Sequence, residues 1–108
     1  MLRYDFIVMN MKIHESDKML TEGKVDVYVT VGLSAMNSIQ ESINIAGRKN
    51  NEFLSILDFG CGYGRVLRHF KEFFPGADVQ GADINYDGPQ FCKEHLGASE
   101  AHKSTEDF

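Results

Sequence analysis

The sequence predicts one α/β domain in which a parallel βαβα unit follows an N-terminal arm and a helix. A short apolar segment at 53–59 predicts a strand, and three alternating glycines connect it to an amphipathic pattern at 64–74. A second strand–helix pair is predicted over 78–84 and 87–97. This alternation of strands and helices favours a parallel sheet with right-handed crossovers. A chain of 108 residues is long enough for one small domain.

The composition is that of an ordinary globular protein, with 43% hydrophobic and 25% charged residues. A net charge of −5 and scattered basic residues argue against a stand-alone nucleic-acid binder, which needs a concentrated basic face. No apolar run approaches the ~20 residues of a membrane span. Asp5, Asn10 and Lys12 interrupt the N-terminus, so it does not resemble a signal peptide. Cys61 and Cys92 form no C-x-x-C pair, so we expect a cytoplasmic protein without a disulfide framework or metal site.

The N-terminal part is predicted to be an arm over residues 1–33, ahead of the main domain at 34–108. Residues 1–24 follow neither a helical nor a strand period. Over 24–31, valines alternate with more polar residues. This pattern favours an extended segment, because β-branched residues prefer extended backbone.

A helix is predicted over 34–47. Ser34 is a suitable N-cap, since its hydroxyl can accept from a backbone N–H of the first turn. Gly47 can adopt the left-handed conformation that ends many helices. The apolar stripe expected in the core consists of Met36, Ile39, Ile43 and Ala46.

The strand at 53–59 is mostly apolar, as expected of a strand buried in a parallel sheet. The helix that follows is predicted to end at Pro75 and Gly76 and to turn His69 toward solvent. Its apolar face consists of Val66, Leu67, Phe70 and Phe74.

The second strand and helix are predicted from the same kinds of signal. The segment 78–84 is apolar enough for a strand, and Pro89 fits the first turn of the helix at 87–97. Gly97 is its expected end. The polar tail at 98–108 predicts no element.

The glycines at positions 60, 62 and 64 mark the expected binding site. In an open α/β sheet, ligands bind beyond the carboxyl ends of the strands, where this loop is predicted to lie. Glycine permits unusual dihedral angles there and lets a ligand approach the main chain. The next helix would add N–H groups and a partial positive charge.

Two acidic residues indicate the kind of ligand. Asp58 precedes the first glycine by two positions, where a carboxylate opposes a phosphate but suits a cationic amine. Asp83 ends the second strand, where a carboxylate can accept hydrogen bonds from both hydroxyls of a ribose. A ligand with an amine and a ribose has the description of S-adenosylmethionine.

The stretch "ILDFGCGYGRVLRHFKEFFPGADVQGADI" resembles the first two motifs of class I S-adenosylmethionine-dependent methyltransferases, with a likeness that extends over about residues 30–98. The resemblance implies a Rossmann-like fold, S-adenosylmethionine as cofactor and transfer of its methyl group to an acceptor that the motifs do not identify. It implies that the D-x-G-x-G-x-G loop holds the methionyl part, that Asp83 holds the ribose and that Ile84 packs on the adenine. The implied cofactor-binding residues are Asp58, Gly60, Cys61, Gly62, Tyr63, Gly64, Asp83 and Ile84.

The resemblance is to the N-terminal part of that fold. Family members have a seven-stranded sheet, and only two strand–helix units are recognisable here. We therefore expect an incomplete methyltransferase domain at 34–108, with a second chain as one source of the missing strands. The catalytic residues and the acceptor contacts are not identified.

Two alternatives stay open. A dinucleotide-binding oxidoreductase also uses a glycine-rich loop, although the third glycine comes one position early for G-x-G-x-x-G and Asp58 would oppose the pyrophosphate. A non-catalytic relic that binds a partner chain is the other. Each feature also has a purely structural interpretation. The glycines could form only a tight strand-to-helix turn, Asp58 could be a helix-terminus acid without a ligand role, and Asp83 could be a solvated acid at the end of a strand.

Overall fold

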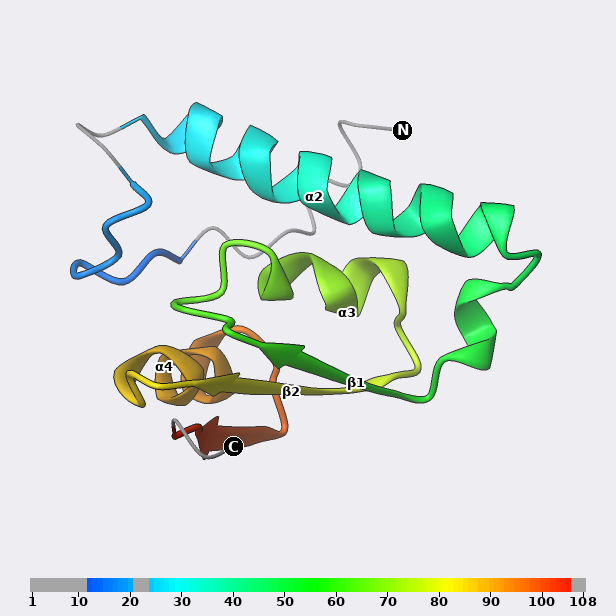
Figure 1. Ribbon diagram of the computed structural model, residues 1–108. Helices are drawn as coiled ribbons and strands as arrows, with labels where there is room; N and C mark the ends of the chain where they lie inside the picture. The colour runs from blue at the N-terminus through cyan, green and yellow to red at the C-terminus, as the bar shows by residue number, and fades with distance from the viewer. Residues whose placement is uncertain (1–11, 21–23, 106–108) are drawn as a thin grey trace.

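The computed structural model describes residues 12–20 and 24–105. Its three strands form one parallel sheet in the order β1-β2-β3, with bounds Ser55–Phe59, Asp78–Asp83 and Glu100–Lys103. The helices are α2 (Val25–Ile45), α3 (Phe70–Phe73) and α4 (Asp87–His95), and the 3₁₀ helices are η1 (Asn50–Glu52) and η2 (Leu67–His69). This arrangement confirms the predicted α/β class and its parallel βαβα unit (Figure 1).

The strand register brings the carboxyl ends of β1 and β2 together. Ser55 lies opposite Asp78 at one end of the pair, and Phe59 lies opposite Ala82 at the other. The acidic residues Asp58 and Asp83 are therefore close to each other at the edge of the sheet where parallel α/β proteins bind ligands.

The segment 24–31 is not extended, contrary to the prediction, because it forms the first two turns of α2. Tyr28, Gly32 and Met36 recur every four residues and are all buried, so the helical period decides over the alternating valines. Gly32 allows close packing, since a Cβ atom there would lie 2.3 Å from the carbonyl oxygen of Arg65. Ser34, the predicted N-cap, lies inside the helix.

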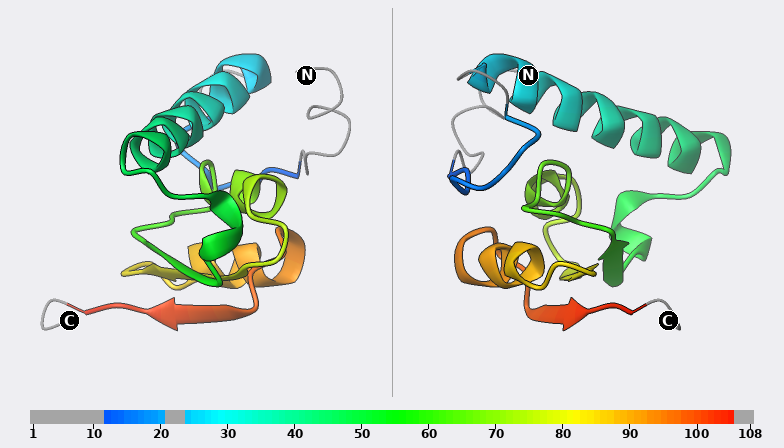
Figure 2. Two further views of the ribbon diagram at one scale, coloured as in Figure 1. Left: turned by 90° about the vertical axis from the view of Figure 1, so that its right-hand side faces the viewer. Right: turned by 60° about the vertical axis from the view of Figure 1, so that its left-hand side comes forward.

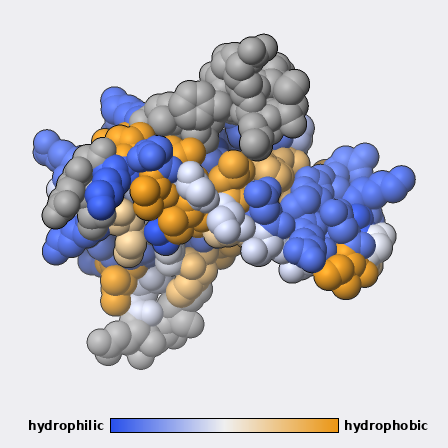
Figure 3. Space-filling model, turned by 90° about the horizontal axis from the view of Figure 1, so that it is seen from above, coloured by the Kyte–Doolittle hydropathy of each residue, from blue (hydrophilic) through white to orange (hydrophobic). Residues whose placement is uncertain are grey.

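The outer surface of α2 is uneven in character. Figure 3, which looks down on this helix, shows hydrophobic groups toward its beginning and mainly hydrophilic groups toward its end. Val25, Val27 and Val31 are exposed in the first turns of α2, and Ile45 is exposed at its last residue. The predicted core stripe is only partly correct, because Met36 is buried while Ile39 and Ala46 are exposed.

The main core lies between α2, the η2–α3 segment, α4 and one face of the sheet, and two views of the ribbon show the helices stacked beside the strands (Figure 2). The predicted apolar face of 64–74 packs there, although only its second half is helical. His69 is fully buried, contrary to the prediction. The core residues include Met36, Leu67, Phe70, Phe74, Val79, Phe91, Cys92 and Leu96.

Strand β1 is not buried throughout, although its apolar sequence predicted that. Its residues alternate between exposed and half-buried, and Leu57 and Phe59 are exposed. By the period of two in a strand, these two side chains lie on the sheet face opposite Ile56 and Asp58. One face of β1 therefore carries the core contacts and the other is open.

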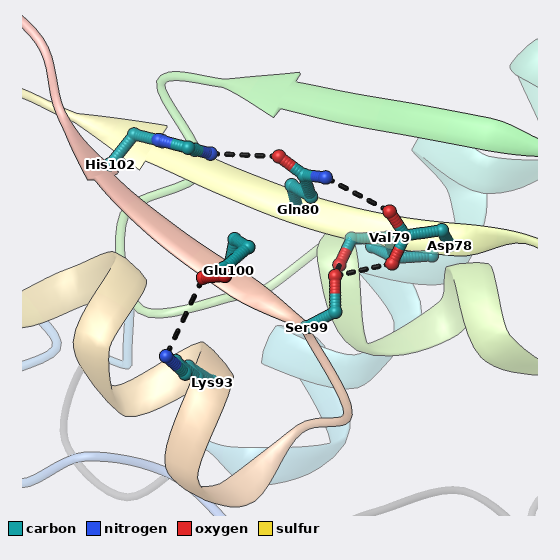
Figure 4. Close-up of polar contacts among 7 residues, drawn as sticks. All are labelled: Asp78, Val79, Gln80, Lys93, Ser99, Glu100 and His102. Carbon is teal, nitrogen blue, oxygen red and sulfur yellow. Dashed lines mark hydrogen bonds and ion pairs between the residues drawn. The ribbon is translucent and has the colours of Figure 1, made fainter.

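Strand β3 was not predicted, because its sequence Glu-Ala-His-Lys lacks β-branched and aromatic residues. Polar side chains join it to its neighbours (Figure 4). His102 contacts Gln80 of β2 at 2.7 Å, and Lys93 of α4 forms an ion pair with Glu100 at 3.5 Å. The Ser99 hydroxyl donates to Asp78 just before the strand.

None of the helices in the described part of the chain combines the length and apolar character that crossing a membrane requires.

Candidate functional site

The glycine loop joins β1 to η2 through three left-handed residues. Gly60, Gly62 and Gly64 have φ angles of +82°, +53° and +85°, which residues with a side chain rarely adopt. A Cβ atom at Gly60 or Gly62 would meet nothing within 4 Å, so the main chain is open to a ligand there. At Gly64 it would lie 2.4 Å from the Cδ1 of Leu96, so this glycine serves packing.

The loop is held by the end of β2. The N–H groups of Gly60 and Cys61 both donate to the carbonyl oxygen of Ala82, at 2.7 and 3.0 Å. The N–H of Gly62 donates to the Asp83 carboxylate at 2.8 Å. The backbone of the loop is therefore fixed before any ligand arrives, which lowers the entropy cost of binding.

Asp83 binds two backbone N–H groups with its two carboxylate oxygens. One oxygen accepts from the N–H of Gly62, and the other accepts from the N–H of Asn85 at 3.0 Å. Because each carboxylate oxygen can accept more than one hydrogen bond, the group keeps acceptor capacity for a ligand. This structural role in the loop was not evident from the sequence.

Asp58 has no hydrogen-bond or ion-pair partner among the described residues, in contrast to Asp83. Burial and, to a smaller extent, the nearby charge of Asp83 raise the pKa of its carboxyl from 3.8 to about 6. A half-buried carboxylate without a counter-ion is costly. A cationic group placed beside it would remove that cost.

A cavity of about 810 Å³ opens beside the loop. Of the predicted cofactor-binding residues, five line it: Asp58, Gly60, Cys61, Gly62 and Tyr63. Gly64, Asp83 and Ile84 are not part of its wall, and the Ile84 side chain is exposed.

Much of the opposite wall comes from residues that were not predicted. Ser16, Asp17, Lys18 and Met19 line the cavity from the N-terminal segment, and Ala35 and Ile39 line it from α2. The sequence carries no signal for this wall, because the helical spacing of Ile39 predicts a core position, whereas the residue is 36% exposed and lines the cavity.

Tyr63 places its ring against the protein. The ring stacks on that of His14, with centroids 4.3 Å apart, and meets Phe91 edge-on at 6.2 Å. The loop and the N-terminal segment are therefore in direct contact through these two side chains.

The two cysteine side chains are buried beneath the loop as free thiols. The Cys61 and Cys92 thiols both point to the carbonyl oxygen of Gly62, at 3.3 and 3.8 Å. A hydrogen bond with Cys92 and burial both raise the pKa of the Cys61 thiol. These thiols pack the loop and are poorly suited to act as nucleophiles. The described residues also contain no cluster of ligating side chains suited to a metal ion.

No protein-family model matches the chain, and no curated protein matches it. Among solved structures, the chain is similar to coclaurine N-methyltransferase bound to N-methylheliamine and SAH, with 17% identity and a TM-score of 0.45. The match covers 91% of this chain and 26% of the other. The chain thus spans about a quarter of that enzyme's length.

Proposed function

We propose that this chain binds S-adenosylmethionine and forms the cofactor-binding part of a class I methyltransferase. The observation that carries the proposal is the Asp58 carboxylate, which lacks a partner among the described residues and lines the same cavity as the open backbone of Gly60 and Gly62. A ligand with a cationic amine at the end of a slender chain suits both features.

The methionyl part of the cofactor would lie along the glycine loop. Its ammonium group would pair with Asp58, and the absence of side chains at Gly60 and Gly62 leaves room beside the main chain. The hydrogen bonds that the loop N–H groups donate to Ala82 and Asp83 keep this surface in place.

The nucleoside part would extend toward the end of β2. Asp83 retains acceptor capacity for the ribose hydroxyls, while its two bonds to backbone N–H groups hold the carboxylate in one orientation. Ile84 follows directly and has an exposed side chain that can pack on a purine ring.

Bound S-adenosylmethionine would supply a methyl group on a positively charged sulfur: an acceptor nucleophile would bond to the methyl carbon while the carbon–sulfur bond breaks and S-adenosylhomocysteine leaves. The residues of this chain bind and orient the cofactor, so their contribution is one of positioning. The acceptor and any general base are not assigned to residues of the chain.

The dinucleotide alternative is less well supported. A pyrophosphate needs free backbone N–H groups, but those of Gly60, Cys61 and Gly62 donate within the protein. The Asp58 carboxylate would also repel a phosphate in the same cavity.

The proposal is tested by titrating the purified chain with S-adenosylhomocysteine and, separately, with NAD in a calorimeter. We expect heat of binding with S-adenosylhomocysteine only, and loss of that signal in Gly62→Val. A valine there would both intrude on the ligand and resist the positive φ. Cys61→Ala keeps a small side chain and should still bind. Binding of NAD alone would favour the oxidoreductase, and binding of neither would favour a non-catalytic module.

A further inference from the structure

We infer that Arg68 is a positioning residue that fastens the N-terminal segment 12–20 to the glycine loop through Tyr28 and Asp17. The segment then forms a fixed wall of the ligand cavity. The part of the inference that concerns S-adenosylmethionine rests on the proposed function. The part that concerns the coupling between segment 12–20 and the glycine loop is independent of it.

Arg68 is 3% exposed and caps carbonyl groups at the end of the loop. Its Nε donates to the carbonyl oxygen of Gly64 at 2.8 Å, and its Nη2 donates to that of Tyr63 at 3.3 Å. Tyr63 itself lines the cavity, and Gly64 follows it directly. A change in the position of the guanidinium would therefore be transmitted to the loop backbone.

The other side of the guanidinium reaches the N-terminal segment and α2. Its Nη1 donates to the carbonyl oxygen of Lys12 at 2.7 Å, and its Nη2 donates to the Tyr28 hydroxyl at 3.0 Å. That hydroxyl in turn donates to the Asp17 carboxylate at 2.5 Å. The Tyr28 ring also lies 5.1 Å from the guanidinium carbon, within the range of a cation–π interaction.

Asp17 connects this buried network to the cavity. One of its carboxylate oxygens accepts from Tyr28, and the other accepts from the N–H of Met19 at 3.0 Å. Both Asp17 and Met19 line the cavity opposite the glycine loop. The network thus ends on the cavity wall at Asp17 and on the loop backbone at Gly64.

A buried polar network of this kind contributes little to the stability of the fold. Burying a carboxylate and a guanidinium costs desolvation energy, and apolar residues of similar volume often stabilise a core as well or better. What the network adds is a fixed geometry, because its hydrogen bonds hold the N-terminal segment and the glycine loop, which are distant in sequence, in one relative position. A ligand that contacts both walls would then bind to a preformed cavity.

The test is hydrogen–deuterium exchange with and without S-adenosylhomocysteine, on the parent chain, Tyr28→Phe and Asp17→Asn. Tyr28→Phe keeps the ring over Arg68 and removes only the bridging hydroxyl. In the parent, the ligand should slow exchange in both the loop and segment 12–20. In either variant it should slow exchange in the loop only, with affinity about tenfold lower, as expected for loss of hydrogen bonds to charged groups.

Tyr86→Phe is the matched control, because Tyr86 is exposed and lies outside the cavity wall and the network. It should behave as the parent does. Protection of both segments in Tyr28→Phe and Asp17→Asn, as in the parent, would overturn the inference.

A measurement without ligand separates this inference from the proposed function. In the absence of any ligand, segment 12–20 should exchange at least several-fold faster in Tyr28→Phe than in the parent, while α4 exchanges at the parent rate. If the parent binds no S-adenosylhomocysteine but this difference is seen, the proposed function fails and the fastening role stands. Equal exchange in segment 12–20 would contradict the fastening role whatever the ligand result.

Discussion

Two carboxylates at the ends of neighbouring strands have different surroundings, and this difference assigns them different roles. Asp83 accepts from two backbone N–H groups and thereby shapes the loop. Asp58 lies one strand away, with a pKa raised to about 6 and no partner in the described part of the chain. A carboxylate with hydrogen-bond partners fixes the backbone around it, whereas a carboxylate without partners favours the binding of a positively charged group.

The affinity for S-adenosylhomocysteine is expected to fall on acidification if Asp58 binds its ammonium group. The pKa of this carboxyl is about 6 in the free protein, so protonation competes with the ligand below that pH. We expect affinity about tenfold lower at pH 5 than at pH 7, since each pH unit below the pKa costs a factor of about ten. Asp58→Asn should bind weakly and with little pH dependence. A parent whose affinity is the same at pH 5 and pH 7 would exclude this role.

Asp83→Ala is expected to weaken S-adenosylhomocysteine binding by tenfold or more. The variant loses any contact with the ribose and also leaves the part-buried N–H of Gly62 and the exposed N–H of Asn85 without their acceptor. Hydrogen bonds to charged groups contribute about 1.5–3 kcal/mol each. Calorimetry measures the affinity, and circular dichroism checks that the fold is intact. Parent-like affinity in a folded variant would rule out both the ribose contact and the role in shaping the loop.

The loop side of the site could be predicted because its chemistry is local in sequence. Asp58, Gly60 and Gly62 follow one another, and their spacing alone indicates a strand-to-helix turn with room for a ligand. The opposite wall could not be predicted, because Ser16 to Met19 reach the cavity through contacts between distant residues. Tyr28 and Arg68 are 40 positions apart, and nothing in the local pattern of either indicates the pairing.

At the scale of elements, local patterns predicted β1, β2 and α4 well and failed at α2 and β3. Glycine and proline residues lie close to the ends of β1, β2 and α4. In α2 the alternating valines favoured a strand, but the tertiary contacts of Tyr28, Gly32 and Met36 outweigh that intrinsic preference. In β3 the pairing with β2 and a few polar side-chain contacts compensate for a sequence with weak strand preference.

Gly32→Ala is expected to destabilise the packing of α2 against the start of the η2 segment. The new Cβ would lie 2.3 Å from the carbonyl oxygen of Arg65 and 3.2 Å from the Nε2 of His69, so the helix would have to move. We expect a loss of about 1–3 kcal/mol in the free energy of unfolding, as is usual for overpacking. Chemical denaturation measures it. Gly76→Ala is the control, because a Cβ at that position meets nothing within 4 Å, and equal stability of the two variants would contradict the close contact.

The η2 residue His69 is expected to make the fold sensitive to acid. It is fully buried, neither ring nitrogen has a hydrogen-bond partner in the described structure, and burial together with the charge of Arg68 lowers its pKa from 6.5 to about 4. The unfolded chain therefore binds a proton between pH 6.5 and 4 that the folded chain excludes. Stability from this residue is lost as the pH falls through that window and levels off below it.

The measurement compares the parent with His69→Leu, which removes the titrating group at similar volume. Between pH 6.5 and 4 the parent should lose on the order of 3 kcal/mol relative to the variant, given the lowered pKa. Asp58 acts in the opposite sense, because its raised pKa favours the folded state as the pH falls through about 6. The difference between the two proteins cancels that contribution. Stability curves that stay parallel across the window would contradict the assignment.

At the scale of the whole molecule, the sheet divides the surface into two unlike regions. One face of β1 and β2 is packed against η2, α3 and α4, and the cavity beside the glycine loop lies at the carboxyl ends of these strands. On the open face, Leu57 of β1 is 50% exposed, and Leu54, which precedes the strand, is also 71% exposed. Strand β1 pairs only with β2 in the described part of the chain. An apolar strand at the edge of a sheet is a site at which other chains can add.

The chain is therefore expected to self-associate as its concentration rises, through the β1 side of the sheet. Charged residues at an edge strand oppose such pairing, so the double variant Leu54→Lys, Leu57→Lys should remain monomeric at concentrations where the parent forms dimers or larger species. The matched control is Val27→Lys, Val31→Lys on α2, which replaces two apolar side chains that are 49% and 41% exposed on a different surface. Size-exclusion chromatography with light scattering gives the mass of each protein over a dilution series. If the control variant lost association and the β1 variant kept it, the outer face of α2 would be the associating surface. A parent that is monomeric at every concentration would show that the exposed edge of β1 does not recruit a second chain.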